Sequence, residues 1–384
     1  MSADAAAVAR RTIRVLVAAQ VLAGVGLAAG ITVGALLAED MIGSTSSAGL
    51  PTALFTAGSA AAALLVGRVS QARGRRLGLA GGYGVGAAGA AGVVAAAALD
   101  SVPLLFATLF LYGAGLATNL QARYAGADLV PPARRGRAVS TVLVATTLGA
   151  VVGPNLVDAT GHLAEALGVR ALAGPFMLAG VGYALAALAV VALLRPDPLL
   201  LARRLRIGEP PPAAGAAAPP PDERPGPQAA RTLRVAAAAM VVTQAVMAGI
   251  MTMTPVHMRD HGHGLGAAGL VISIHVAAMY LPSPLSGLLA DRAGRRATLG
   301  LGAATLLAAG LLAAAAPADS MVLLTVALAL LGIGWSLGLV AGTALVTDAA
   351  PLATRARTQG RVDLCVALAG AAGGVSSGLV VDLS

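Results

Sequence analysis

The chain has 384 residues, of which 57% are hydrophobic and only 11% are charged. A soluble domain carries about a quarter charged residues, so this composition excludes a water-soluble globule and predicts a multi-pass membrane protein. The formal net charge is +9, but the arginines lie in short segments between apolar runs, not in one basic patch. We therefore expect no binding to nucleic acid.

Eleven apolar runs follow one another along the chain, at residues 15–38, 48–67, 77–99, 102–122, 138–158, 171–194, 233–256, 265–290, 297–316, 321–347 and 363–381. Each is near the length of about 20 residues that crosses a bilayer as a helix. The sequence therefore predicts an all-α integral membrane fold.

All 26 basic residues are arginines. Together with the excess of Ala and Gly, this indicates GC-rich coding and a bacterial source. Most of the arginines precede span one or follow the even-numbered spans, and only Arg170 and Arg259 fall in connections on the opposite side. Because positively charged loops stay in the cytoplasm, we expect a protein of the bacterial cell membrane with a cytoplasmic amino terminus.

Residues 195–232 differ from the other connections, since they are rich in Pro, Ala and Arg and contain two runs of three prolines. This composition predicts a partly extended cytoplasmic linker with little folded structure. We expect it to separate an amino-terminal six-helix bundle, residues 1–194, from a carboxy-terminal bundle, residues 233–384.

The chain contains an internal repeat with an offset of 220 residues. Gly67–Arg76 aligns with Gly287–Arg296, and the alignment continues across several spans, which predicts parallel repeats related by an axis along the membrane normal. Ser384 corresponds to Ala164, just after span five. The repeat therefore predicts five helices in the second half, with the twelfth helix missing from this chain.

Two short charged turns, one in each repeat, carry the clearest pattern in the sequence. Shared positions are Gly67, Gly74 and Arg75 in the first turn and Gly287, Gly294 and Arg295 in the second. Glycine at the turn suits a backbone conformation that other residues disfavour. Asp291 can bind a helix amino terminus, where the dipole is positive, whereas the first copy has Gln71 at that position.

The pattern Gly-x-x-x-Asp-x-x-Gly-Arg-Arg resembles the signature of the major facilitator superfamily of secondary transporters, and the resemblance covers nearly the whole chain. It implies two pseudo-symmetric six-helix bundles, with Asp291 capping a helix of the opposite bundle to hold one access state. It also implies ion pairs between Arg75 and Asp128 and between Arg295 and Asp348. The alternative is that these arginines only determine the topology.

A second resemblance is to the antiporter motif of drug exporters in the same superfamily, and it rests on Gly149, Gly153 and Pro154. Val157 and Asp158 stand where that motif continues to a pair of glycines. Leu109 stands where the exporters carry an arginine. The alternative for Gly149 and Gly153 is close helix packing.

Polar residues at membrane depth are candidates for binding a substrate or a proton. His275 titrates near physiological pH and could carry a proton, or it could be hydrogen-bonded within the bundle. Gln20, Asn119 and Gln244 could orient a substrate or join helices. Tyr112 and Trp335 could line a cavity or pack in the core. His257, His261 and His263 are spaced closely enough to bind a metal, but Gly262 and Gly264 are interleaved with them, which favours a flexible loop.

No nucleophile–base pair and no phosphate-binding loop of the Walker type occurs, so we expect no enzyme activity, no cofactor and no metal. The interpretation is a monomeric transporter that works by alternating access, with efflux of a small amphipathic compound in antiport with protons as the favoured activity. Two alternatives stay open: a nutrient uptake symporter, and a non-transporting membrane sensor or inactive truncated transporter.

Overall fold

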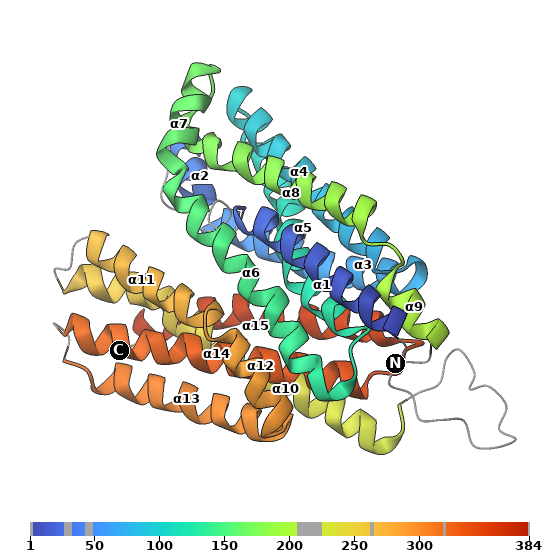
Figure 1. Ribbon diagram of the computed structural model, residues 1–384. Coiled ribbons are helices and arrows are strands. Elements are labelled where there is room, and N and C mark those ends of the chain that lie inside the picture. Colours follow the sequence, from blue (N-terminus) through green and yellow to red (C-terminus); the bar gives the residue numbers. More distant parts are fainter. Residues whose placement is uncertain are drawn as a thin grey trace, which may run out of the picture. The chain divides into compact units, whose positions relative to one another are not determined.

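The computed structural model describes residues 3–26, 33–42, 49–205, 225–261, 265–317 and 320–382 (Figure 1). Within these ranges the chain folds into helices joined by turns, without a strand. The helices are α1 (Ala3–Gly24), α2 (Gly34–Ile42), α3 (Gly49–Arg73), α4 (Arg75–Ala98), α5 (Val102–Ala127), η3 (Pro132–Arg134), α6 (Arg135–Asn155), α7 (Val157–Ala166), η4 (Ala171–Ala173), α8 (Gly174–Leu193), α9 (Pro198–Leu205), α10 (Pro227–Asp260), α11 (Leu265–Tyr280), α12 (Ser283–Arg292), α13 (Arg295–Ala315), α14 (Met321–Ala349) and α15 (Arg355–Asp382).

Among the described residues, eight stretches are long and apolar enough to cross a membrane. They correspond to α3, α4, α5, α8 with α9, α10, α11 with α12, α13 and α14. The three other expected spans correspond to α1, α6 and α15, which adjoin or include positions that are not fully described. The structure thus confirms an all-helical, multi-pass architecture.

Several expected spans are interrupted. The span expected at 265–290 is two helices, because Pro282 and Pro284 lie where α11 gives way to α12. In the first span, α1 ends at Gly24 and α2 begins at Gly34, and residues 27–32 lie outside the described set. Proline cannot donate the backbone hydrogen bond of a helix interior, which explains the break before α12.

The expected linker is also partly helical, which corrects the prediction for its ends. Helix α9 occupies Pro198–Leu205, and α10 begins at Pro227. Asp197 stabilises α9, since its Oδ1 accepts hydrogen bonds from the backbone N–H groups of Leu199 (3.0 Å) and Leu200 (3.1 Å). Residues 206–224, with both runs of prolines, lie outside the described part of the chain.

By their contacts, the residues form two compact units. Unit 1 consists of Met1–Pro131, Ala145–Arg224 and Ala350–Leu364, and unit 2 consists of Pro132–Val144, Pro225–Ala349 and Cys365–Ser384. Helix α6 contributes its beginning to unit 2, and α15 contributes its beginning to unit 1. Each unit therefore includes the amino-terminal turns of a helix from the other half of the sequence.

Within unit 1, α4 packs against α3, α5 and α8, and within unit 2, α14 packs against α10, α11, α12 and α13. Glycine allows the closest crossings. A Cβ atom added to Gly89 of α4 would lie 2.3 Å from the backbone nitrogen of Tyr112 on α5. No larger residue fits there without separating the two helices.

Candidate functional site

The two motif turns have the same backbone geometry. Gly74 has φ 93° and ψ 163°, and Gly294 has φ 94° and ψ 149°. Each glycine immediately precedes the helix that carries the Arg-Arg pair, α4 in the first turn and α13 in the second. The prediction of an unusual glycine conformation is confirmed, since side chains strongly disfavour these angles.

In the second turn, Asp291 binds the amino terminus of α6, a helix from the amino-terminal half of the sequence. Its Oδ1 accepts a hydrogen bond from the N–H of Gly136 (2.9 Å), and its Oδ2 accepts one from the N–H of Arg137 (3.0 Å). The Arg137 Nε atom lies 3.3 Å from the same oxygen. The buried carboxylate thus satisfies two N–H groups that a helix leaves unpaired and meets the positive end of the dipole.

The expected ion pair between Arg295 and Asp348 is present, and a third residue joins it. Asp348 Oδ2 lies 2.5 Å from Arg295 Nε, and its Oδ1 accepts a hydrogen bond from Arg135 Nη1 at 2.7 Å. Arg295 also donates to the backbone oxygen of Pro132. One carboxylate at the end of α14 therefore binds the turn and the first residue of α6 together.

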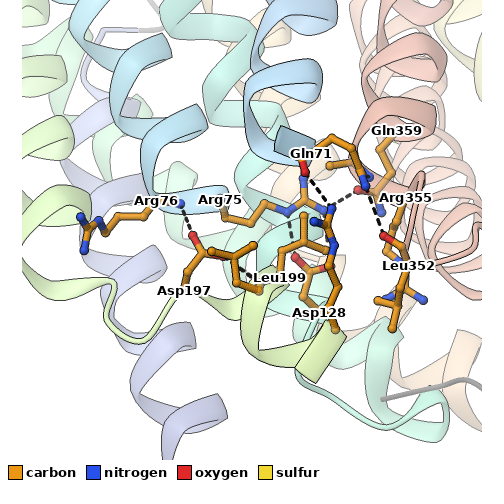
Figure 2. Close-up of polar contacts among 12 residues, drawn as sticks. Gln71, Arg75, Arg76, Asp128, Asp197, Leu199, Leu352, Arg355 and Gln359 are labelled. Carbon is orange, nitrogen blue, oxygen red and sulfur yellow. Dashed lines mark hydrogen bonds and ion pairs between the residues drawn. The ribbon is translucent and has the colours of Figure 1, made fainter. Parts of the chain in front are cut away.

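In the first turn, Gln71 binds the amino terminus of α15 in the corresponding way (Figure 2). Its Oε1 accepts hydrogen bonds from the N–H groups of Ala356 (2.8 Å) and Arg357 (3.4 Å). Its Nε2 donates to the backbone oxygens of Leu352 (3.3 Å) and Ala353. The neutral amide lacks the charge of Asp291, but it holds the loop before α15 as well as the helix itself.

The expected pair of Arg75 and Asp128 is present and fully buried. Arg75 donates from Nε to Asp128 Oδ2 (2.8 Å) and from Nη2 to Oδ1 (3.4 Å), so both carboxylate oxygens are used. Arg75 Nη2 also donates to Gln359 Oε1, which brings α15 into the same network (Figure 2). A fork-like arginine–carboxylate pair of this kind is strong and directional.

The motif glycines Gly67 and Gly287 mark two equivalent helix crossings. A Cβ on Gly67 would lie 2.8 Å from the backbone oxygen of Ala356, and a Cβ on Gly287 would lie 2.5 Å from that of Gly136. Ala356 and Gly136 are equivalent in the 220-residue repeat. The two motif turns therefore hold α15 and α6 at corresponding positions.

The sequence did not single out Asp197, yet this residue braces the first turn. Its Oδ2 accepts a hydrogen bond from the N–H of Arg76 at 2.7 Å, so Asp197 caps α4 as well as α9 (Figure 2). Arg203 of α9 donates to the backbone oxygen of Gln71 at 2.8 Å. An acidic residue just before Pro198, the first residue of an amphipathic helix, was the available signal.

A second buried ion pair, also missed, joins α5 to α15. Arg123 Nη2 donates to Asp363 Oδ1 at 2.6 Å, and the hydroxyl of Tyr124 donates to the same oxygen at 3.1 Å. Both charged side chains are at least nine-tenths buried. The signal in the sequence was an acid at the first position of the expected span 363–381.

Two of the candidate polar residues, Gln20 and Asn119, meet in unit 1. Gln20 Nε2 donates to Thr146 Oγ1 (2.9 Å) and to the backbone oxygen of Asn119 (3.1 Å), and Tyr83 donates to Gln20 Oε1 at 2.7 Å. These bonds connect α1, α4, α5 and α6. Tyr112 is likewise buried and donates to the backbone oxygen of Gly26. In this arrangement the residues join helices.

In unit 2, the candidates Trp335 and Gln244 contact each other. The indole N–H of Trp335 donates to Gln244 Oε1 at 2.9 Å, and the ring of Tyr280 meets the indole edge-on at 5.5 Å between centroids. Gln244 and Tyr280 are only partly buried. Trp335 itself is buried, so the partly exposed members of this group are Tyr280 and Gln244.

His275 is buried between α11 and α14, where its Nδ1 lies 2.8 Å from the backbone oxygen of Leu328. Its Nε2 atom has no hydrogen-bond partner among the described residues. Nδ1 thus joins two helices. When Nδ1 carries the ring hydrogen, Nε2 has a lone pair that can accept a proton or a hydrogen bond.

The remaining candidates lie partly outside the described set. Gly149 packs against α1, since a Cβ there would lie 2.3 Å from the backbone oxygen of Val21, which favours the packing interpretation. Gly153 and Pro154 lie in the last turn of α6, where only the backbone is described. His261 Nδ1 lies 2.8 Å from the oxygen of His257, and His263 lies outside the described residues.

Membrane-crossing helices in two related sets, each with an arginine turn bound to a helix amino terminus, define a helical membrane transporter. The chain belongs to the Major Facilitator Superfamily, whose sequence profile matches residues 16–374. It is therefore a multi-pass membrane transporter and not an enzyme.

Known relatives agree with this assignment. The chain is 53% identical over 372 residues to the uncharacterized MFS-type transporter YddS of Bacillus subtilis, covering 97% of this chain and 85% of that protein. It is 32% identical over 363 residues to the riboflavin transporter RfnT of Brucella anthropi, covering 93% and 86%. Among solved structures, the human organic anion transporter MFSD10 shares the fold, with a TM-score of 0.72 at 17% identity over 96% of this chain and 93% of that one.

Proposed function

We propose that this transporter exports a small amphipathic compound in exchange for protons by alternating access. In this proposal residues 195–232 separate an amino-terminal six-helix bundle, residues 1–194, from a carboxy-terminal bundle, residues 233–384. The protein lies in the bacterial cell membrane with its amino terminus in the cytoplasm. Positive residues in the connections support this orientation.

One observation carries the mechanism: each motif turn binds the first turn of a helix from the other half of the sequence. Asp291 caps α6 and Gln71 caps α15, through 2.9 Å and 2.8 Å hydrogen bonds to Gly136 and Ala356. Such contacts at helix ends can be broken and remade without changing the helices themselves. We propose that they act as latches that close the cytoplasmic side.

For substrate binding, the proposal uses the group of Trp335, Gln244 and Tyr280. The aromatic rings provide apolar contact, and the amide provides a directional hydrogen bond once it is released from the indole N–H. Trp335→Phe keeps a ring but removes that N–H, so we expect it to change affinity less than Trp335→Ala does. For proton coupling, His275 is a candidate because of its unpartnered Nε2.

The proposal is tested with purified protein in vesicles. A thermal-shift screen that includes ethidium and riboflavin first selects the compound that binds best. An antiporter then accumulates that compound when the vesicle interior is acidic, whereas a symporter accumulates it when the exterior is acidic. Equal uptake at either polarity would contradict proton coupling.

The role of His275 has its own control. His275→Ala is expected to abolish the response to the proton gradient, whereas His162→Ala is not, because that side chain is 82% exposed. Coupled transport that survives in His275→Ala places the coupling proton elsewhere while leaving export intact.

A second candidate function is uptake of a planar heteroaromatic nutrient. Two observations favour it: the 32% identity to a protein named as a riboflavin transporter, and the aromatic pair of Trp335 and Tyr280. Riboflavin accumulation driven by an acidic exterior would support uptake over export.

A further inference from the structure

Asp363 is a buried carboxylate that accepts hydrogen bonds with only one of its two oxygens. Arg123 and Tyr124 both donate to Oδ1, at 2.6 Å and 3.1 Å. Oδ2 is buried and has no hydrogen-bond partner in the part of the chain that the structure describes. Asp128, by contrast, offers both oxygens to the fork of Arg75.

A buried carboxylate oxygen without a donor is costly, because nothing replaces the water it has lost. A protonated carboxyl lowers that cost, because a neutral O–H is less costly to bury than a charged oxygen. Its carbonyl oxygen still accepts hydrogen bonds while the other oxygen carries the proton. This division matches Asp363, with Oδ1 as the acceptor and Oδ2 as the site of the proton.

Arg123 has interactions that do not depend on a full negative charge at Asp363. Its guanidinium carbon lies 4.4 Å from the centre of the Tyr124 ring, and its Nη1 donates to the backbone oxygen of Leu120. A cation over an aromatic face is stabilised by the ring electrons. The guanidinium can therefore stay buried beside a neutral Asp363.

The charged surroundings of Asp363 are mainly positive. Arg123 of α5 is its ion-pair partner, and the neutral Tyr124 donates a hydrogen bond to it. Arg75 of α4, which is itself paired with Asp128, acts on it electrostatically without a hydrogen bond. On the neighbouring α3 and on α15 itself, the exposed arginines are Arg68, Arg73, Arg357 and Arg361. These cations favour the ionised carboxylate and burial favours the protonated one, so the outcome depends on how closely α15 packs against α5.

From this geometry we propose that Asp363 is a proton-binding site, occupied on Oδ2 while the first two turns of α15 are packed in unit 1. The proton comes from water and returns to water when that segment separates and the carboxyl is hydrated. The link to transport rests on the proposed proton coupling, but the proton site itself does not. Gln71, which caps α15, is not titratable, so the first latch has no acid of its own. Asp363 supplies a titratable group on α15, about two turns after the capped residue Ala356.

Infrared spectroscopy of the purified full chain, without substrate or gradient, tests the site directly. We expect a protonated-carboxyl C=O band that is lost in Asp363→Asn, shifted in Asp363→Glu and retained in the exposed-acid control Asp158→Asn. Absence of any band that depends on residue 363, at every pH where the protein stays folded, overturns the proposal.

Thermal unfolding provides a second test with a matched pair. Asp363→Asn is an uncharged isostere of the protonated side chain, so we expect it to be tolerated, whereas Asp128→Asn should strongly lower the unfolding midpoint. If Asp363→Asn unfolds as readily as Asp128→Asn, or more so, Asp363 is an ionised structural partner and the proposal fails.

Linkage to movement is measured with spin labels on two positions of unit 1. One is Thr358→Cys, a partly exposed position in the first turn of α15, and the other is Leu188→Cys, an exposed position of α8. The single cysteine of the chain, Cys365, is replaced by serine. Acid should increase the fraction of molecules with the label-to-label distance of the state in which the first turns of α15 are packed in unit 1. In Asp363→Asn this fraction should be high at all pH values. A wild-type pH response that persists in Asp363→Asn contradicts the proposal. If the infrared band depends on residue 363 but transport does not respond to a proton gradient, the proposed proton coupling is refuted. The proton-binding site at Asp363 is then still supported.

Discussion

Gln71 and Asp291 are equivalent residues that bind equivalent helix ends with different chemistry. Gln71 Oε1 accepts from the N–H of Ala356 at 2.8 Å, and Asp291 Oδ1 accepts from that of Gly136 at 2.9 Å. The aspartate adds a negative charge at the helix dipole, whereas the amide adds two donated bonds to Leu352 and Ala353. The two latches are therefore alike in position but not in their dependence on charge.

Restoring a charge to the first latch by Gln71→Glu is expected to destabilise it. The gain at the helix dipole is about 0.3–1 kcal/mol, but two carbonyl oxygens lose a donor and face a carboxylate oxygen, at a cost of about 1–3 kcal/mol. We expect a lower unfolding midpoint by circular dichroism. Gln228→Glu makes the same chemical change at an exposed position and should have little effect. A rise in the midpoint of Gln71→Glu would refute this account.

Removing the charge from the second latch by Asp291→Ala leaves the N–H groups of Gly136 and Arg137 without their acceptor. Loss of a helix cap costs about 0.5–2 kcal/mol. We therefore expect a lower unfolding midpoint and an altered transport rate in vesicles. Asp158→Ala, an exposed acid in the first turn of α7, serves as the control. Identical behaviour of the two variants would mean that Asp291 is not a latch.

The motif glycines provide a comparison in which the backbone is the same and the surroundings differ. A Cβ at Gly294 meets nothing within 4 Å, whereas a Cβ at Gly74 would lie 2.4 Å from Asp197 Oδ2. Gly294→Ala should cost about 1–3 kcal/mol from backbone strain alone. Gly74→Ala should cost more, because it also displaces the cap of α4. The prediction is wrong if the order of the two unfolding midpoints is reversed.

The buried pair of Arg75 and Asp128 should be far more sensitive than an exposed one. Asp128→Asn leaves the Arg75 charge buried, which costs about 3–5 kcal/mol, and replacing both residues by leucine should recover part of the loss. Arg170 binds Asp100 (2.7 Å) and Asp40 (2.5 Å) at exposed positions, and these bonds raise the pKa of its guanidinium. Arg170→Gln should nevertheless have a small effect on unfolding, since exposed ion pairs contribute little. Equal losses in the two variants would contradict the burial argument.

Much of the architecture was predictable from patterns that act locally. Apolar runs predict helices because unpaired backbone N–H and C=O groups are too costly in lipid. The repeat predicts that the two motif turns bind equivalent residues, 220 positions apart in the sequence. The ion pairs of Arg75 with Asp128 and of Arg295 with Asp348 followed from that repeat and from the family resemblance. The conformation of Gly74 and Gly294 followed from the chemistry of glycine alone.

Only the tertiary structure shows the contacts of Asp363 and Asp197. The same is true of the double role of Gln71, which binds both the α15 amino terminus and the loop before it. The partners of Asp363 lie 239 and 240 residues away in the sequence, and Asp197 reaches Arg76 across 121 residues. No repeat relates these contacts, because the counterpart of Asp363 is Leu143 and that of Arg123 is Thr343. Composition and spacing determine which segments become helices and where they turn. Which side chains meet depends on which helix faces pack together, and packing is a property of the whole chain.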